Sequence, residues 1–393
     1  MKTVKRFTSI FLALVFLLSS MSILSQAASE PNRLIETDGF IYYILDFKQK
    51  TAELYRIKDS ALGKDGTLII PGVINGYKII ELTDYTFLDF TVKDNIRKII
   101  ISDGIKKYNA NIYDPGDGPM GGCKNLKEII IPDDFSIGYA MLSNSPKLEK
   151  VTFKGKVNYI GDYAFSNCTA LKELKIPEGV VSIGENAFAY CKSLKKVTFP
   201  STLKSIDRGA FCGCKSLEGK LKLPKSLKKV GIGAFAFCTK LTGFRIADGN
   251  KYLSQKGGVL FDKKKTKIYC YLSGKETKEY KIPSTVKSVS RYAFAGTKHL
   301  NKLTFSDKIT KIPEDTFYES KVKHIVFSKS VKEIKDDSLS HNKSLRSLTV
   351  KNKKCKMPGH WDYKGKKITV YGYKNSTAQT FAKKAKLKFV KLK

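Results

Sequence analysis

The sequence predicts an elongated, β-rich solenoid in which short repeats stack and their strands form a parallel sheet along one face. The main observation is a recurring pattern of apolar residues with a period of about 23 residues, with successive copies starting at Leu171, Leu194 and Leu217. A second observation is that the strand pattern of each copy ends in proline, as at Pro177 and Pro200. A repeat of this length cannot bury its apolar face alone, so the copies must stack on one another.

Each copy supplies two walls of a common core. Leu174 and Ile176 alternate with polar residues, which places them together on the inner face of a strand. Pro177 ends that strand because it has no backbone N–H to donate. The later pair Ala187-Phe188 is one small and one large apolar residue, and we expect it to close the opposite wall.

One position of the repeat holds a cysteine or another small side chain. The residues at this position are Cys123, Cys168, Cys191, Cys214, Cys238, Thr297 and Asn342. Exchange among Cys, Thr and Asn indicates a turn where a small side chain meets buried backbone polar groups. One cysteine per repeat, with no C-x-x-C motif and no His pair, argues against zinc. We expect neither a metal nor a cofactor.

The segment Ile183–Pro200 reads I-G-x-x-A-F-x-x-C-x-x-L-x-x-V-x-F-P. This pattern resembles that of the BspA-type leucine-rich repeat family, and the resemblance extends over nearly the whole chain after its first 27 residues. It implies a leucine-rich repeat solenoid, a secreted or surface-displayed protein and a binding or adhesive role. The family has no shared catalytic residues, so the resemblance assigns none here.

The chain is predicted to contain a signal peptide, two caps and a repeat region. Residues 1–27 combine a basic start, an apolar centre and small residues before the cleavage point. Residues 28–80 are read as an N-terminal β cap, 81–351 as the solenoid and 352–393 as a C-terminal cap. No stretch after residue 27 approaches the roughly 20 apolar residues of a membrane span. We expect a secreted monomer that is free or held at a surface by charge alone.

Two stretches interrupt the repeats. Residues 109–122 contain turn residues and two aspartates, and they predict a surface loop because the calcium-loop register is absent. Residues 248–279 lengthen one repeat, and Gly258–Phe261 with Lys267–Tyr271 predict a β-hairpin with a Lys-rich tip. In the caps, residues 40–45 and 51–55 predict two strands, and residues 376–386 predict a short helix.

The charge balance points to anionic partners. The formal net charge is +36, and loss of Lys2, Lys5 and Arg6 with the signal peptide lowers it by three to +33. An excess this large attracts polyanions, and the attraction weakens with salt. Outward positions of the predicted strands form a basic stripe. The candidate binding residues on it are Lys150, Lys175, Lys196, Lys220, Lys222, Arg245, Lys281 and Lys302.

The leading hypothesis is adhesion to an anionic host or cell-surface polymer, either a glycan or a wall polymer, through this stripe. The alternative is a protein-binding module whose specificity lies in the two insertions. Lysine richness also has a plain role in keeping a long sheet protein soluble. Nucleic acid would bind non-specifically by the same charge. Secretion and the lack of aromatic residues interleaved in the stripe argue against nucleic acid as the purpose.

The sequence does not predict an enzyme. It has four histidines, and none lies in an H-E-x-x-H motif. Asp84, Asp162 and Glu185 recur at one repeat position, whereas acid–base catalysis needs carboxylates in different environments. The lone Trp361 is read as a packing residue rather than a platform for a sugar ring. We therefore expect a non-catalytic protein with no catalytic residue.

Overall fold

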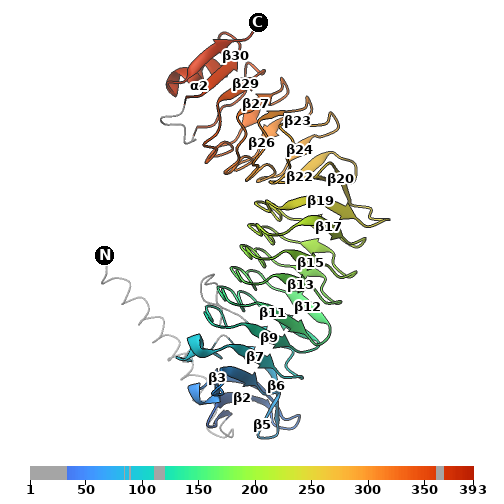
Figure 1. Cartoon of the computed structure of the whole chain (residues 1–393), viewed down its shortest axis with the longest axis vertical. Coiled ribbons are helices and arrows are strands. Elements are labelled where there is room, and N and C mark those ends of the chain that lie inside the picture. The colour runs from blue at the N-terminus through green and yellow to red at the C-terminus, as the bar shows by residue number, and fades with distance from the viewer. Residues whose placement is uncertain (1–32, 84, 88–89, 110–119, 360–366) are drawn as a thin grey trace, which may run out of the picture.

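The computed structural model describes residues 33–83, 85–87, 90–109, 120–359 and 367–393. It is a β-solenoid of about 14 coils, with the N-terminal cap at one end of the stack and the C-terminal cap at the other (Figure 1). The predicted signal peptide, most of the first insertion and Trp361 lie outside the described residues. None of the helices in the described part has the length and apolar character that a membrane crossing requires.

One strand from each coil lies on what we call the first face. These strands are β4 (Thr67–Ile70), β7 (Lys98–Ile101), β9 (Glu128–Ile131), β11 (Lys150–Phe153), β13 (Glu173–Lys175), β15 (Lys196–Thr198), β17 (Gly219–Leu223), β19 (Leu241–Ile246), β23 (Glu279–Lys281), β25 (Lys302–Thr304), β27 (His324–Phe327) and β29 (Ser347–Val350). Neighbours pair in parallel, as predicted, and Leu174 lies opposite Val197 with both side chains buried. The face is divided into four hydrogen-bonded sheets, which break after β11, β15 and β19.

A second strand of each coil forms the second face. These strands are β6 (Tyr77–Thr83), β8 (Lys107–Asn109), β10 (Phe135–Ile137), β12 (Val157–Ile160), β14 (Ser182–Ile183), β16 (Ser205–Ile206), β18 (Lys229–Val230), β24 (Ser288–Val289), β26 (Lys311–Ile312) and β28 (Glu333–Ile334). A turn follows each second-face strand, and the stacked turns make a third side, which we call the turn face. Backbone bonds join these turns, as where Phe188 N–H donates to Ala210 C=O at 2.8 Å.

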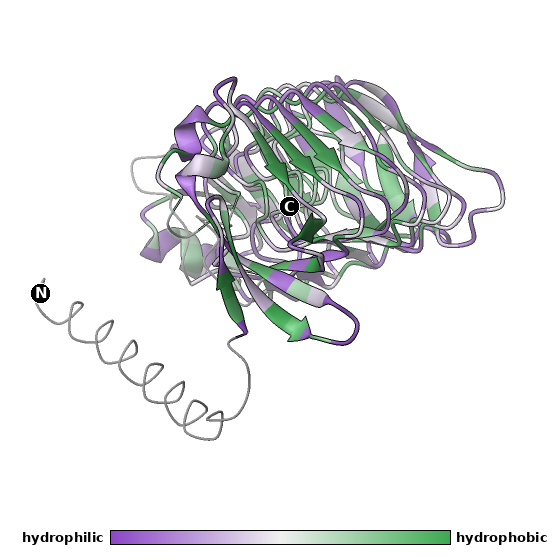
Figure 2. Cartoon of the chain, turned by 90° about the horizontal axis from the view of Figure 1, so that it is seen from below, coloured by the Kyte–Doolittle hydropathy of each residue, from purple (hydrophilic) through white to green (hydrophobic). Residues whose placement is uncertain are grey.

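The core lies between the three sides. Phe165, Phe188, Phe211 and Phe235 stack one above the other, with ring centroids 5.2, 5.3 and 5.8 Å apart. Apolar strand segments and polar turns alternate around each coil in the view along the stack (Figure 2). The buried residues form two clusters, one ending at Leu272 and the other running from Val259 to Ala382, so the core divides within the second insertion.

The caps close both ends of the stack. At the N-terminal end, β1 (Leu34–Glu36), β2 (Phe40–Asp46) and β3 (Thr51–Ile57) form an antiparallel meander, which confirms the two predicted strands. Strand β5 (Val73–Ile74) pairs with β6, and the short 3-10 helices η1 (Asp59–Ala61) and η2 (Lys93–Asn95) lie nearby in the chain. At the other end, β30 (Thr369–Gly372) and β31 (Lys388–Lys391) flank α2 (Thr377–Lys384), as predicted. The hydroxyl of Ser376 caps α2.

The second insertion contains three strands rather than the predicted two. The predicted hairpin is present as β21 (Val259–Asp262) and β22 (Lys267–Tyr271), and β20 (Leu253–Lys256) adds to its open edge. The Asp262 carboxylate holds the turn, because it accepts from the N–H groups of Thr266 and Lys267 at 2.6 and 2.8 Å. Strand β22 then pairs in parallel with β24, so the end of the insertion serves as the second face of a coil.

Candidate functional site

All eight predicted binding residues are exposed side chains on the first face, but they do not form one continuous stripe. Strand β19 is the last of its sheet, and it packs beside β20 and β21 of the second insertion. Strand β23 starts a separate six-stranded sheet. Lys281 and Lys302 therefore lie beyond the insertion, apart from the residues that precede it.

The outer members of the predicted stripe are partly neutralised or isolated. Lys150 Nζ lies 2.7 Å from a Glu128 oxygen, and Lys302 Nζ lies 3.7 Å from Glu279. The ammonium groups of Lys150 and then Lys98 lower the pKa of the Glu128 carboxyl, which keeps this carboxylate ionised. Two further members face uncharged neighbours, since Lys175 lies opposite Thr198 and Lys281 opposite Thr304. None of these positions concentrates positive charge.

The other four residues, Lys196, Lys220, Lys222 and Arg245, lie on β15, β17 and β19, and we call them the central basic patch. Lys222 and Arg245 are direct register partners on paired strands. Within the described part of the chain, no ion pair involves any of the four. Like charges placed opposite one another destabilise a sheet. Lys196 has Glu173 as its register partner on β13, whereas Lys220, Lys222 and Arg245 have no acidic register partner. The uncompensated positive charge is therefore concentrated at these three residues.

Two glycines shape the centre of this patch. The Gly219 inserted into the repeat has φ of +71° and produces a register shift before Lys220. A Cβ atom at Gly243 would lie 3.3 Å from Cγ of Lys220, so the aliphatic stem of Lys220 lies across β19 at the one position that lacks a side chain. The ammonium group is thereby carried over the adjoining strand.

Two hollows meet at Lys220. The smaller, of about 280 Å³, lies between β15 and β17 and is lined by the three lysines of the patch. The larger, of about 800 Å³, lies between β19 and the second insertion, where Gln255 and Lys275 join Lys220 at its wall. The sequence had not assigned a role to Gln255 or Lys275. The only signal for them was that an insertion follows Arg245 in the chain.

The chemistry of the patch is that of anion recognition. Each Lys ammonium offers three donors, and the Arg guanidinium offers a planar fork that matches carboxylate, sulfate and phosphate groups. Among the described residues, no group of three or more His, Cys, Asp or Glu side chains is placed to hold a metal ion. The four side chains are all cationic donors, so the chemistry available to them is contact with anionic groups.

Comparison with known proteins agrees with this architecture. A family model described as the BspA type leucine rich repeat region matches the chain in six copies, over residues 80–218, 136–257 and 264–386. No curated protein is significantly similar to the chain.

Three solved structures share the fold. A leucine rich cell surface protein from Faecalibacterium prausnitzii A2-165 is 22% identical, with a TM-score of 0.65 over 82% of this chain and 90% of that chain. The pneumococcal vaccine antigen PcpA is 20% identical, with a TM-score of 0.61 over 93% of this chain and 100% of that chain. A leucine-rich repeat protein from Eubacterium ventriosum ATCC 27560 is 21% identical, with a TM-score of 0.56 over 91% of this chain and 83% of that chain. At these identities the likeness shows the fold alone.

Proposed function

The chain belongs to the BspA-type leucine-rich repeat family, and we propose that it is an extracellular, non-catalytic adhesion protein that contacts an anionic host or cell-surface polymer through the central basic patch. The family and its fold are typical of binding modules rather than enzymes. One structural relative is described as a cell surface protein and another as a vaccine antigen, which supports an exposed location. The signal-peptide pattern of residues 1–27 supports secretion, with residues 81–351 as the binding solenoid between two caps.

The observation that carries this proposal is the pairing of Lys222 with Arg245 without a carboxylate partner. If the lysines served only solubility, electrostatic repulsion in the folded chain would be smallest with each lysine beside an acidic residue. Lys150 and Lys302 are placed in this way. An anionic polymer would relieve the repulsion between Lys222 and Arg245 by charge-assisted hydrogen bonds. An open, shallow groove also suits a polymer whose charges repeat along its length.

The proposal is tested with heparin as a sulfated probe and a purified teichoic acid as a phosphate-rich probe. The test variant carries Lys220→Gln, Lys222→Gln and Arg245→Gln. The matched control carries Lys204→Gln, Lys287→Gln and Lys332→Gln, which removes the same charge from exposed residues that adjoin second-face strands.

At 150 mM NaCl we expect the test variant to bind at least tenfold more weakly, because three phosphate- or sulfate-type contacts are lost. The control should change affinity by twofold or less, and binding of the wild-type chain should fall steeply between 50 and 500 mM NaCl. Equal weakening of both variants would contradict a patch-centred site and would leave only generic charge.

The second candidate is a protein partner, and the 800 Å³ groove beside the second insertion favours it. Gln255→Arg adds a bulky positive charge at the wall of this groove. Polymer binding through the patch should be retained or strengthened, whereas a protein docked in the groove should be displaced. A partner interface should also weaken much less with salt than polymer binding does.

A further inference from the structure

A hollow of about 270 Å³ lies on the turn face, away from the first-face strands that carry the basic patch. Aromatic side chains dominate its lining, and a few polar groups complete it. The residues that matter here are Tyr190, Phe237, Tyr292, Tyr318, Glu185 and Arg208. Exposed aromatic surface of this kind is not needed by the core, because the stacked Phe residues already fill the interior.

The rings lie against a floor made by glycine. Tyr190 is 47% exposed, and a Cβ atom at Gly213 in the next coil would lie 2.6 Å from Cδ1 of the Tyr190 ring. Phe237 lies against Gly296 in the same way, since a Cβ atom there would overlap the Phe237 ring. The two glycines thus let flat rings rest directly on the backbone of the neighbouring coil.

These aromatic residues occupy a strained backbone conformation. Tyr190, Phe237 and Tyr292 have φ values of +59°, +61° and +59°, in the left-handed region. The slot that Tyr190 and Phe237 share holds Gly213 and Gly296 in two other coils, and it keeps a positive φ at Asn167, Glu319 and His341. The left-handed conformation is therefore a property of the repeat. Tyr190 and Phe237 differ from these residues in placing aromatic rings there.

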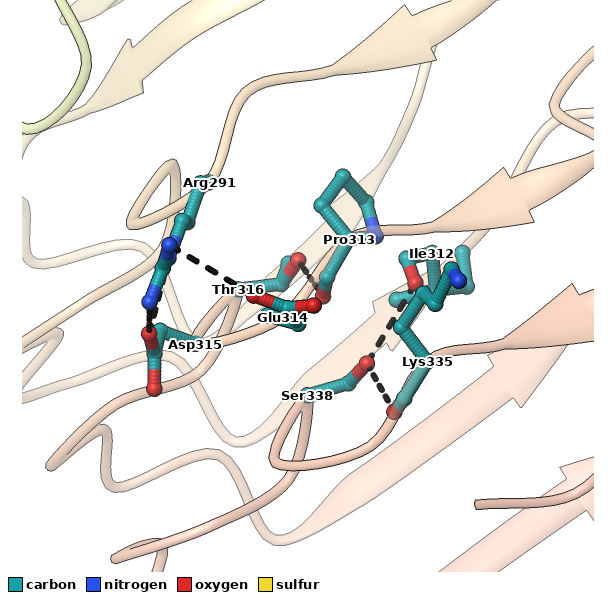
Figure 3. Close-up of polar contacts among 8 residues, drawn as sticks. All are labelled: Arg291, Ile312, Pro313, Glu314, Asp315, Thr316, Lys335 and Ser338. Atoms are coloured by element: carbon teal, nitrogen blue, oxygen red, sulfur yellow. Dashed lines mark hydrogen bonds and ion pairs between the residues drawn. The ribbon is translucent and has the colours of Figure 1, made fainter. Parts of the chain in front are cut away.

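One wall of the hollow is braced. The Arg291 guanidinium lies over the Tyr292 ring, 5.5 Å from its centroid. Asp315 holds Arg291, because its Oδ2 accepts from Nε at 2.8 Å and from Nη2 at 2.5 Å, and Glu314 adds a contact of 3.4 Å (Figure 3). Tyr318 packs edge-on against both Tyr292 and Phe237, with centroids 5.8 and 6.2 Å apart.

The opposite wall has unused binding capacity. Among the described residues, no ring contact is made by Tyr190, so a face of its ring is open to a ligand. At the rim, Arg208 Nε lies 3.8 Å from Glu185 Oε1, which is too long for a hydrogen bond. Asn186 Nδ2 makes a weak bond of 3.4 Å to the same carboxylate. A carboxylate, an amide and a guanidinium therefore lie at the rim of the hollow, around the aromatic rings.

We propose that this hollow is a second binding site, for the pyranose rings of a neutral carbohydrate. A sugar ring has an apolar C–H face that stacks on an aromatic ring and hydroxyl groups at its edge that need both donors and acceptors, and the hollow provides both. The opposite charges of Glu185 and Arg208 cancel, which favours a neutral ligand over the polyanions suited to the first face. The volume suits one or two rings rather than a folded protein.

The test uses isothermal titration calorimetry on residues 28–393, the chain without the predicted signal peptide. The three neutral probes are the hexamers of N-acetylglucosamine, of β-1,4-linked glucose and of α-1,4-linked glucose. Tyr190→Gly and Phe237→Gly introduce the residue that two other coils carry at this position, so the turn backbone of both variants should be retained, which circular dichroism checks. We expect each to lower affinity for the bound hexamer at least tenfold. Tyr159→Ala, which removes an exposed ring from the second face, should change affinity by less than twofold.

Salt and a chemical reporter separate this site from the basic patch. Hexamer binding should be unchanged between 0.15 and 0.5 M NaCl, and the variant with Lys220, Lys222 and Arg245 replaced by Gln should bind it normally. Cys212 lines the hollow and is half-buried, so bound hexamer should slow its alkylation in the wild-type chain.

Absence of binding by all three hexamers at 5 mM, or binding that both glycine variants retain, would overturn the assignment. Displacement of the bound hexamer from the wild-type chain by a polyproline peptide would also overturn it, because the hollow would then be a peptide-binding groove.

Discussion

At the residue scale, the cysteines of the repeat act as hydrogen-bond donors in the core. The thiol of Cys191 donates to Phe165 C=O at 3.2 Å, and the thiol of Cys214 donates to Phe188 C=O at 3.2 Å. Burial raises the pKa of Cys191 to about 12, so the thiol stays protonated and retains the hydrogen that it donates. This geometry confirms the prediction of a small side chain that meets buried backbone groups.

The same pKa argument predicts a selective labelling pattern. Seven of the eight cysteines are buried, and Cys212 is the one with partial exposure. Burial, followed by the nearby charge of Glu319, raises the pKa of Cys212 to about 11, so its thiolate is scarce at pH 8. We expect mass spectrometry to find at most one slow iodoacetamide adduct on the folded chain, at Cys212, with a rate that rises from pH 8 to pH 10. Eight fast adducts should appear after unfolding. Rapid labelling of Cys191 in the folded chain would contradict its burial and its hydrogen bond to Phe165.

A carboxylate in the N-terminal cap predicts a pH effect on stability. Burial, and then the adjacent charge of Glu81, raise the pKa of Glu53, whose register partner across β3 and β6 is Glu81. A raised carboxyl pKa means that the folded state favours the protonated form, so stability is lost as pH rises from 4.5 through the folded-state pKa. Glu53→Gln should therefore stabilise the chain at pH 7.5, by about 0.5 kcal/mol after allowance for solvent access.

The measurement is the difference in melting temperature between Glu53→Gln and the wild-type chain. This difference should be positive at pH 7.5 and near zero at pH 4. A matched change at the exposed Glu149, Glu149→Gln, should show no such pH dependence. A larger gain at pH 4 than at pH 7.5 would show that the sign of the argument is wrong.

At the element scale, strands were predictable because their signals are local. Alternation and a closing proline placed β13 and β15, and turn residues placed the hairpin of β21 and β22. Strand β20 was not predicted, since its pairing depends on the tertiary position of the insertion. The same reason applies to the candidate site. Sequence spacing predicted that its basic residues face outward and that Lys281 and Lys302 follow the insertion. Only the stacking of coils shows which of them lack a carboxylate and that the sheet is interrupted at the insertion.

The aromatic hollow was missed for a related reason. Tyr190 and Tyr318 are more than a hundred residues apart, and both read as ordinary members of degenerate repeats. Both line the same hollow, and the second insertion lies between them in the chain. A signal was available in hindsight: aromatic residues stand at positions where neighbouring repeats have Gly213 and Gly296.

A single serine joins the turns on either side of the insertion. Ser273 Oγ accepts from Phe237 N–H at 3.1 Å and donates to Ala295 C=O at 2.9 Å. Ser273→Ala would leave the half-buried Phe237 N–H and the buried Ala295 C=O without this partner, so we expect a loss of roughly 2 kcal/mol in the free energy of unfolding, measured by urea denaturation. The control is Ser145→Ala, because the buried Ser145 hydroxyl has no hydrogen-bond partner among the described atoms. It should change stability by less than about 0.5 kcal/mol, and equal losses in both variants would contradict the bridging role.

At the scale of the whole molecule, both proposed sites adjoin the joint between the two core clusters. The central basic patch ends at β19, and the aromatic hollow lies on the turns that flank the same insertion. An uninterrupted solenoid repeats each surface from coil to coil, and so it offers many weak and equivalent positions. The insertion breaks this equivalence, because it adds a wall to the groove on one side and brings distant rings together on the other.

The net charge gives a prediction about stability that runs opposite to the one about binding. A folded chain with a net charge of +33 has strong internal repulsion, and salt screens this repulsion. We therefore expect the melting temperature of the wild-type chain to rise by a few degrees between 20 and 300 mM NaCl. Its affinity for heparin should fall over the same range.

The variant with Gln at Lys220, Lys222 and Arg245 should have a higher melting temperature in 20 mM NaCl than the control variant at Lys204, Lys287 and Lys332, because the patch places like charges opposite each other. The melting temperatures of the two variants should become equal at 300 mM NaCl. A patch variant that is no more stable than the control at low salt would show that Lys222 and Arg245 do not repel one another, and would remove the physical reason for an anion to bind there.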